Sequence, residues 1–196
     1  SVSNHKYDVG NYKTVDRAFG DDRIFRVLTA KAHAYGVKVI LDGVFSHTGA
    51  ESVYFNRSGS YPGIGAAQST TSPYYSWYSF DEYPQTYRCW WGMTNMPEVN
   101  EEDEAYQRFL LWEEDSVICR WHQNGIDGWR LDVVHMLGEA GGARNNLQHV
   151  AGITQAAKET QPEAYVVGEH FGDARQWLQA DADDAAMNYR GSTFPL

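Results

Sequence analysis

Three carboxylate residues stand where short apolar runs give way to polar residues. Asp42 follows the run 37–41, Asp132 follows the run 126–131, and Glu169 follows the run 165–167 with one glycine between. In a sheet of parallel strands, functional side chains gather beyond the carboxyl ends of the strands. The pattern therefore predicts one pocket lined by carboxylates.

The residue types in this predicted pocket suit acid and base chemistry. Arg130 and Asp132 are two residues apart, so on a strand their side chains point the same way, and the guanidinium is expected to keep the carboxylate ionised. Partial burial of Glu169 is expected to raise its pKa and keep it protonated as a general acid. One low and one high carboxyl pKa is the division of labour that glycoside cleavage needs.

Each of these residues also has a structural interpretation. An isolated Asp or Glu at a strand end is often a cap or an ion-pair partner. Asp42 either orients Arg130 or caps the following loop, and His47 either donates to a sugar hydroxyl or packs as a buried histidine. The aromatic stretch 74–91 either stacks on sugars or forms a small core of its own.

The elements around these residues alternate between helix and strand. Helical spacing is found at 22–35, at 106–121 and at 147–160, and strands are predicted at 37–41, 126–131 and 165–167. The irregular stretch 49–100 is predicted to be an inserted subdomain, because a structureless loop of that length is unusual. The order predicts part of an α/β parallel architecture.

Composition and charge narrow the classes of partner. The 196 residues are 42% hydrophobic, and 16 basic against 26 acidic residues give a net charge of −10. This balance predicts no nucleic-acid and no membrane-surface partner. The sequence contains no apolar run of roughly 18 residues, so no membrane-spanning helix is predicted. Cys89 and Cys119 form no CxxC pair, so they are expected to be free thiols in a reducing, cytoplasmic compartment.

The two ends of the chain suggest a piece of a longer protein. Residues 1–5 include no initiator Met and read as the middle of a loop, whereas 187–196 reads as an apolar, strand-like segment. We therefore expect an excised part of a larger protein.

The motifs around the predicted strand ends resemble the α-amylase family, glycoside hydrolase family 13. The resemblance rests on three ordered motifs, Asp42-Gly43-Val44-Phe45-Ser46-His47, Gly128-Trp129-Arg130-Leu131-Asp132 and Val167-Gly168-Glu169, and on two flanking ones, His5-Lys6-Tyr7-Asp8 and Met96-Pro97-Glu98-Val99-Asn100. Residues 127–196 look most similar to bacterial maltodextrin glucosidase, and the first half resembles the neopullulanase and cyclomaltodextrinase group.

The resemblance implies a fold and a reaction. It implies part of a (β/α)8 TIM barrel, about strands 3 to 5 plus the start of the next, with 49–100 as a domain B-like insertion. It also implies a retaining α-glycoside hydrolase that acts on maltodextrins or related short α-glucans. In that reaction Asp132 is the nucleophile, Glu169 is the acid and base, and their carboxyl groups lie about 5–5.5 Å apart.

The resemblance further implies residues that bind the sugar. Tyr7 stacks on the glucose, His47 donates to its hydroxyls, and Arg130 orients Asp132. Asp8 and Asp42 belong to the same substrate-binding set, and His135 and His170 shape the preference for the leaving group. It implies no cofactor, and a homodimer of the full-length parent is possible.

Some positions depart from the pattern of the family. Ser46 stands where the family usually has an Asn that helps to bind calcium, so we predict no calcium at this position. Glu98 replaces the more usual Lys or Asp, and it leaves open the choice between α-1,4 and α-1,6 linkages. The sequence also leaves open the balance of hydrolysis and transglycosylation. The family's third carboxylate has no counterpart in these 196 residues.

Two other functions stay open at this stage. One is a metal-dependent hydrolase that uses residues of the same cluster as ligands, although Arg130 beside Asp132 competes with a cation. The other is a non-catalytic sugar-binding relative. A complete barrel takes ~200–250 residues or more, so the chain expressed alone is expected to be inactive and aggregation-prone.

Overall fold

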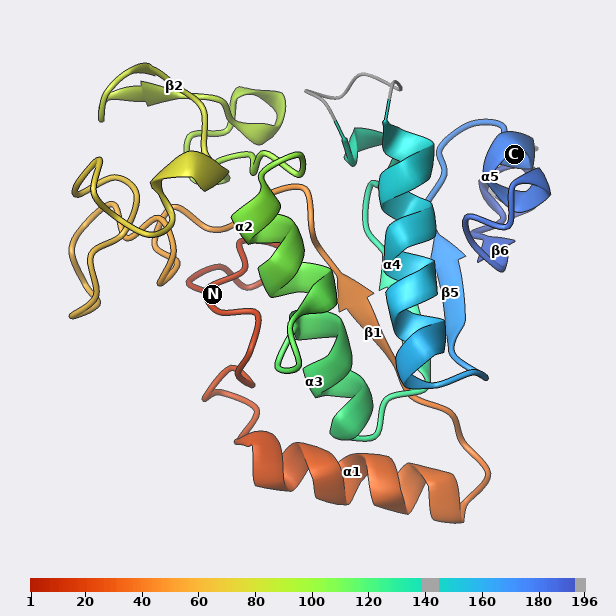
Figure 1. Ribbon diagram of the computed structural model, residues 1–196. Coiled ribbons are helices and arrows are strands. Elements are labelled where there is room, and N and C mark those ends of the chain that lie inside the picture. Colours follow the sequence, from red (N-terminus) through yellow and green to blue (C-terminus); the bar gives the residue numbers. More distant parts are fainter. Residues whose placement is uncertain (139–144, 193–196) are drawn as a thin grey trace.

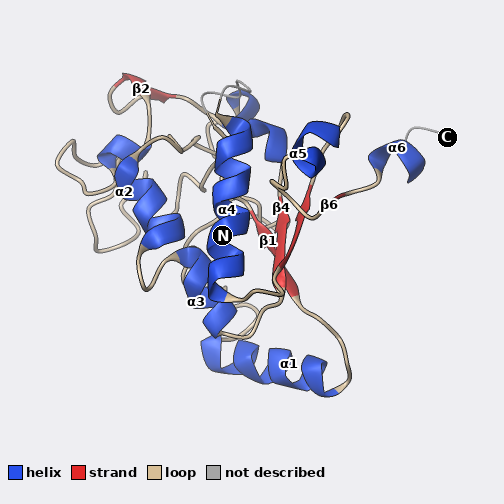
Figure 2. Ribbon diagram, turned by 45° about the vertical axis from the view of Figure 1, so that its right-hand side comes forward, coloured by secondary structure: helices blue, strands red, loops and turns tan. Residues whose placement is uncertain are grey.

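A parallel four-stranded sheet forms the centre of the chain. The computed structural model describes residues 1–138 and 145–192. The strands are β1 (Ile40–Gly43), β4 (Gly128–Leu131), β5 (Tyr165–Gly168) and β6 (Ala185–Ala186). They lie in the order β1-β4-β5-β6, and every pair is parallel (Figures 1 and 2). This is the partial barrel that the sequence predicts.

Three longer helices accompany the sheet. α3 (Val117–Gln123) and α4 (Asn146–Thr160) lie along it, and α1 (Asp22–Ala34) crosses one end (Figures 1 and 2). The predicted start of α1 is confirmed, because the Asp21 side chain caps it by accepting the Ile24 N–H at 2.8 Å. Two shorter helices, α5 (Arg175–Gln179) and α6 (Tyr189–Ser192), flank β6.

The first strand lies further along the chain than predicted and ends at Gly43. It begins at Ile40, whereas a strand over 37–41 was expected. The buried Asp127 carboxylate accepts the Val39 N–H at 2.8 Å, Lys38 Nζ lies 3.0 Å away and His33 Nε2 lies 2.7 Å away. The Asp127 N–H also donates to the Val39 carbonyl at 2.6 Å, so both the backbone and the side chain of Asp127 bind the stretch that precedes β1. The same contacts hold the pKa of Asp127 down at about 2, against the opposing effect of burial.

The helix predicted over 106–121 is broken in three. α2 (Glu104–Gln107) leads into a π-helical turn, Arg108–Trp112, and α3 begins only at Val117. Ser116 accepts the Cys119 N–H at 3.2 Å, so a new N-cap starts α3. α3 ends at Gln123, two residues beyond the predicted stretch.

The chain also differs from the prediction after β6. A strand-like segment was expected over 187–196, but α6 occupies Tyr189–Ser192 and residues 193–196 lie outside the described part. The Asn188 side chain accepts the Gly191 N–H at 2.8 Å. This local bond favours a helical turn over further strand pairing.

The inserted segment 49–100 lies at the end toward which the strands point (Figure 1). It contains the hairpin β2 (Phe80–Glu82) and β3 (Thr86–Tyr87), with 3-10 turns at Tyr75–Trp77 and Trp90–Gly92. Its aromatic side chains do not form a separate core. The Trp77 ring lies 5.1 Å from the Tyr106 ring and 5.0 Å from the Phe109 ring. Whether the segment is a domain of its own stays a prediction.

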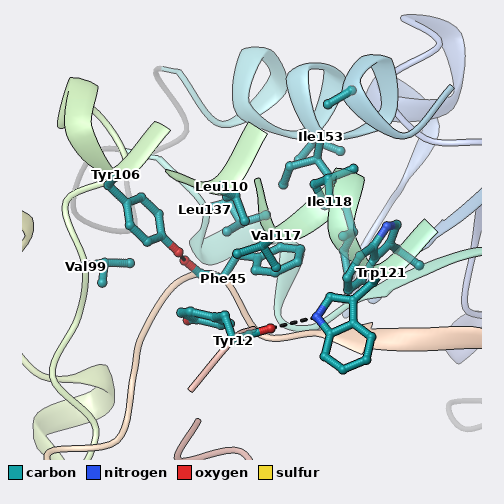
Figure 3. Close-up of a cluster of buried hydrophobic side chains, with 14 of the residues drawn as sticks. Tyr12, Phe45, Val99, Tyr106, Leu110, Val117, Ile118, Trp121, Leu137 and Ile153 are labelled. Atoms are coloured by element: carbon teal, nitrogen blue, oxygen red, sulfur yellow. Dashed lines mark hydrogen bonds between the residues drawn. The ribbon is translucent and has the colours of Figure 1, made fainter. Parts of the chain in front are cut away.

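The main core joins the inserted segment to the helices on the sheet (Figure 3). Two buried polar contacts fix the loops within it. Trp121 Nε1 donates to the Tyr12 carbonyl at 2.7 Å, and the Tyr106 hydroxyl donates to the Phe45 carbonyl at 2.8 Å. The first bond fixes the N-terminal loop at Tyr12, and the second positions the loop that follows β1.

Candidate active site

One guanidinium joins the three carboxylates that the sequence singles out. Arg130 Nη1 lies 2.7 Å from Asp42 Oδ1 and 2.5 Å from Asp132 Oδ1, and Arg130 Nη2 lies 2.7 Å from Glu169 Oε1. Asp132 and Glu169 are buried, and the Asp42 side chain is 43% exposed. The cluster thus has one open side, at Asp42.

The register of the sheet brings these side chains together. Asp42 is the partner of Arg130 across β1 and β4, and Arg130 is the partner of Val167 across β4 and β5. The hydrogen-bond ladder continues past both strands, because the Asp132 N–H donates to the Gly43 carbonyl and the Glu169 N–H to the Leu131 carbonyl. The carboxyl ends of β4 and β5 therefore hold Asp132 and Glu169 on a rigid frame.

Glu169 has two further partners that the sequence analysis did not identify. The Val133 N–H donates to Glu169 Oε2 at 2.8 Å, and the Tyr189 hydroxyl donates to Glu169 Oε1 at 2.7 Å. Val133 takes a left-handed conformation, φ 38° and ψ 49°, which is uncommon for a β-branched residue. It precedes the short 3-10 turn Val134–Met136. Tyr189 follows the end of β6, but the sequence pattern placed it inside a strand-like segment, so it gave no signal for this contact.

The prediction that the pKa of Asp132 is low is wrong. Burial raises the pKa of the Asp132 carboxyl to about 6, and the Arg130 guanidinium only partly opposes this. The nearby Asp42 and Glu169 carboxylates add to the rise. Desolvation and two like charges therefore outweigh one shared cation.

The other predicted sugar-binding residues near Asp42 differ in exposure. The Tyr7 hydroxyl donates to Asp42 Oδ2 at 3.3 Å, so Tyr7 lies at the cluster. His47 is buried, its Nδ1 lies 3.0 Å from Ser46 Oγ, and burial lowers its pKa to about 4. Asp8 is also buried, where it accepts the Val2 and Ser3 N–H groups at 3.0 and 3.1 Å. The structure thus gives Asp8 a role in folding the first loop.

The two histidines near Glu169 lie in different surroundings. The His135 ring is 4.7 Å from the Phe171 ring, and burial lowers the pKa of His135. His170 is buried with its Nε2 2.6 Å from Asp183 Oδ2, and the Trp177 ring covers it at 4.4 Å. His170 and Asp183 therefore form a buried hydrogen-bonded pair, and the sugar contact of His170 stays a prediction.

A separate hollow lies away from the carboxylates. It has a volume of about 710 Å³ and is lined by residues such as Lys6, Asn11 and Tyr61. Its one acidic residue, Asp16, is paired with Lys6 at 3.0 Å. The hollow contains none of the residues that bind Arg130, so we assign the candidate site to the carboxylate cluster.

The described residues give little support to metal chemistry. Within residues 1–138 and 145–192, no group of three or more His, Cys, Asp or Glu side chains is arranged to hold a metal ion. In the cluster itself the Arg130 guanidinium stands between the carboxylates. The same described ranges contain no helix with the length and apolarity to cross a membrane.

The parallel β/α frame with carboxylates beyond its strand ends defines part of a (β/α) barrel with its candidate site at the carboxyl ends of the strands. Residues 1–194 match the alpha amylase catalytic domain, and the chain belongs to that family. The match confirms the resemblance seen in the motifs.

Known proteins similar to the chain are longer than it is. An amylopullulanase of Thermoanaerobacterium thermosulfurigenes is 36% identical over 208 residues, which cover 97% of this chain and 11% of that protein. An intracellular maltogenic amylase of Bacillus subtilis is 33% identical, with coverage of 95% and 29%.

A solved structure shows the same arrangement. The cyclic alpha-maltosyl-(1-->6)-maltose hydrolase of Arthrobacter globiformis, in complex with that sugar, superposes with a TM-score of 0.81 at 27% identity. The match covers 96% of this chain and 40% of the hydrolase. The chain thus spans well under half the length of each of these proteins.

Proposed function

We propose that the full-length protein is a retaining α-glycoside hydrolase of maltodextrins or related short α-glucans. The observation that carries this is the Arg130 guanidinium, which holds Asp132 on one terminal nitrogen and Glu169 on the other. Two carboxyl groups on one guanidinium lie close together, as retaining cleavage requires. The names of the similar enzymes given above indicate α-glucan substrates, which supports the same substrate class.

The proposed reaction has two steps. Asp132 attacks the anomeric carbon while the glycosidic bond breaks, and Glu169 gives its proton to the leaving oxygen. Glu169 then takes a proton from water, and the resulting hydroxide displaces Asp132, so the anomeric configuration is retained. Arg130 Nη2 contacts Glu169 Oε1. Before the first step the sugar has to break this contact, so that the Glu169 carboxyl group can reach the leaving oxygen.

The remaining residues are proposed to position the sugar. Tyr7, hydrogen-bonded to Asp42, would stack on the glucose at the cleaved bond, and His47, kept neutral by burial, would donate to a hydroxyl. Asp42 holds Arg130 in place. His135 faces Glu169, and with His170 it is proposed to shape the leaving-group side.

The cellular location and the oligomeric state of the full-length protein are also proposals. The free thiols of Cys89 and Cys119 and the intracellular Bacillus subtilis relative support a cytoplasmic protein. A homodimer of the full-length protein is proposed from the family resemblance alone.

Anomeric proton NMR on maltotriose tests the proposed reaction. The full-length protein is expected to release the α-anomer first, and Asp132→Asn is expected to be slower by at least about 10³-fold, the scale of removing a nucleophile. Initial release of the β-anomer, or equal rates for both proteins, contradicts the proposal. Binding of maltotriose without turnover by the unmodified protein indicates a sugar-binding relative instead.

A further inference from the structure

Three donors from different elements hold the Glu169 carboxylate. Arg130 Nη2 and the Tyr189 hydroxyl each lie 2.7 Å from Oε1, and the Val133 N–H lies 2.8 Å from Oε2. Arg130 lies on β4, Val133 follows β4, and Tyr189 begins α6. The position of Glu169 therefore depends on a segment that comes 20 residues later in the chain.

The three donors differ in what else they do. Arg130 is shared with Asp42 and Asp132, so its removal disturbs the whole cluster. Val133 contributes a backbone group, set by its left-handed conformation, which a side-chain substitution does not delete. Tyr189 donates through its side chain, and among the hydrogen bonds of the cluster described above its hydroxyl contacts Glu169 and no other carboxylate.

The Tyr189 ring is itself fixed by packing. It meets the Phe171 ring edge-on at 5.4 Å, and the Phe171 ring lies 4.7 Å from His135. Since a packed aromatic ring has few free torsions, its hydroxyl is directed at one place. Here that place is Glu169 Oε1.

From this arrangement we infer that Tyr189 is a positioning residue for Glu169, on the premise that the proposed function is right. The phenol O–H stabilises the carboxylate that exists after Glu169 has given up its proton and before it takes one from water. Packing against Phe171 then sets the direction of the Oε1 lone pairs. The sequence motifs assign no such role to Tyr189.

The charged and titratable groups that face Glu169 come from several elements. They are Arg130 and Asp132 from β4 and its end, His135 from the turn that follows, and Tyr189 from α6. A Tyr189→Phe variant leaves the other three in place and keeps the ring. Any change in the titration of Glu169 can then be assigned to the lost hydroxyl.

The test is the pH dependence of kcat/KM for maltotriose with the full-length protein and its Tyr189→Phe variant. Without the hydroxyl the charged carboxylate loses a donor, so the basic limb is expected to move up by about one pH unit, which corresponds to about 1.4 kcal/mol. Tyr83→Phe is the matched control. It also removes a hydroxyl that donates to a protein acceptor, the Ala66 carbonyl at 3.2 Å, and its profile is expected to match the unmodified protein.

A second measurement does not depend on turnover. The protein is labelled with 13C at the side-chain carboxyl carbon of glutamate. The Glu169 signal is assigned by its loss in Glu169→Gln, and its chemical shift is then followed as a function of pH. An upward shift of its midpoint in Tyr189→Phe supports the inference, even if maltotriose is not cleaved and the proposed function fails. Unchanged midpoint and unchanged basic limb overturn the inference and leave the proposed function standing.

Discussion

At the scale of single residues, the cluster sets three carboxylates against one cation. Arg130 contacts Asp42, Asp132 and Glu169, and no second cation contacts the carboxyl groups of Asp132 or Glu169 among the described ion pairs. Burial of Asp132 therefore has a cost that its partner does not fully offset. The proposed function accounts for such an arrangement, since buried, mutually repelling carboxyl groups are what acid and base catalysis uses.

This cost predicts a pH-dependent gain in stability for Asp132→Asn. The folded pKa of Asp132, about 6, lies above its ordinary value, so the unmodified protein is destabilised as pH rises from about 4 through 6. The variant avoids this loss. We expect it to be more stable by about 1–2 kcal/mol at pH 7, after allowance for solvent screening, and by much less at pH 4.

Urea unfolding of both full-length proteins at pH 4 and pH 7 measures the difference. Asp81→Asn removes an exposed carboxyl group in the inserted segment and reports the general effect of net charge. A stability difference between Asp132→Asn and the unmodified protein that stays constant with pH contradicts the raised pKa of Asp132.

At the scale of elements, the close approach of β4 and β5 places the side chains of Asp132 and Glu169. Gly128 pairs with Tyr165 at the start of both strands. A Cβ at position 128 would lie 1.8 Å from the Tyr165 carbonyl oxygen, a backbone atom that cannot rotate away. The glycine therefore permits the pairing that ends with Leu131 beside Gly168, one residue before Asp132 and Glu169.

We accordingly expect Gly128→Ala to destabilise the full-length protein by at least about 1–3 kcal/mol, the scale of a forced backbone shift. Maltotriose turnover is expected to fall with it, because the two carboxyl groups separate. Gly172→Ala is the control, since a Cβ there meets nothing within 4 Å. Thermal unfolding of both variants measures the effect, and equal melting temperatures would argue against the importance of this contact.

At the scale of the whole molecule, the described sheet has two edge strands, β1 and β6. Within residues 1–138 and 145–192, β1 pairs only with β4 and β6 only with β5. Apolar side chains on α1 are also exposed, with Leu28 at 56% and Ile24 at 46%. An unpaired edge beside exposed apolar surface is a site for association between chains.

The 196-residue chain expressed alone is therefore expected to aggregate and to leave maltotriose uncleaved. Size-exclusion chromatography with light scattering checks the first point, with the full-length protein as reference. Ile40→Lys places a charge on the edge strand β1, where Ile40 is 40% exposed, and is expected to reduce aggregation. A monomer that unfolds cooperatively and cleaves maltotriose would show the prediction to be wrong.

Local patterns in the sequence were sufficient for the order of the elements and for the central cluster. Apolar runs that end at Asp42, Asp132 and Glu169 predict a shared pocket, because parallel strands present their carboxyl ends together. Helical spacing from residue 22 predicts the start of α1, and the cap that the structure shows at Asp21 bonds to a group only three residues away. These features depend on neighbours in sequence or on a general rule of sheet geometry.

Other features were decided only by contacts between distant segments. Asp127 binds the stretch 38–39 that precedes β1, and Tyr189 reaches Glu169 from beyond β6. The pKa of Asp132 follows burial, which a run of residue types does not specify. Sequence spacing reports what a residue can do, whereas desolvation and partners remote in the chain decide what it does. The physical reason is that desolvation and contacts with remote partners depend on distances in space, which only the folded chain sets.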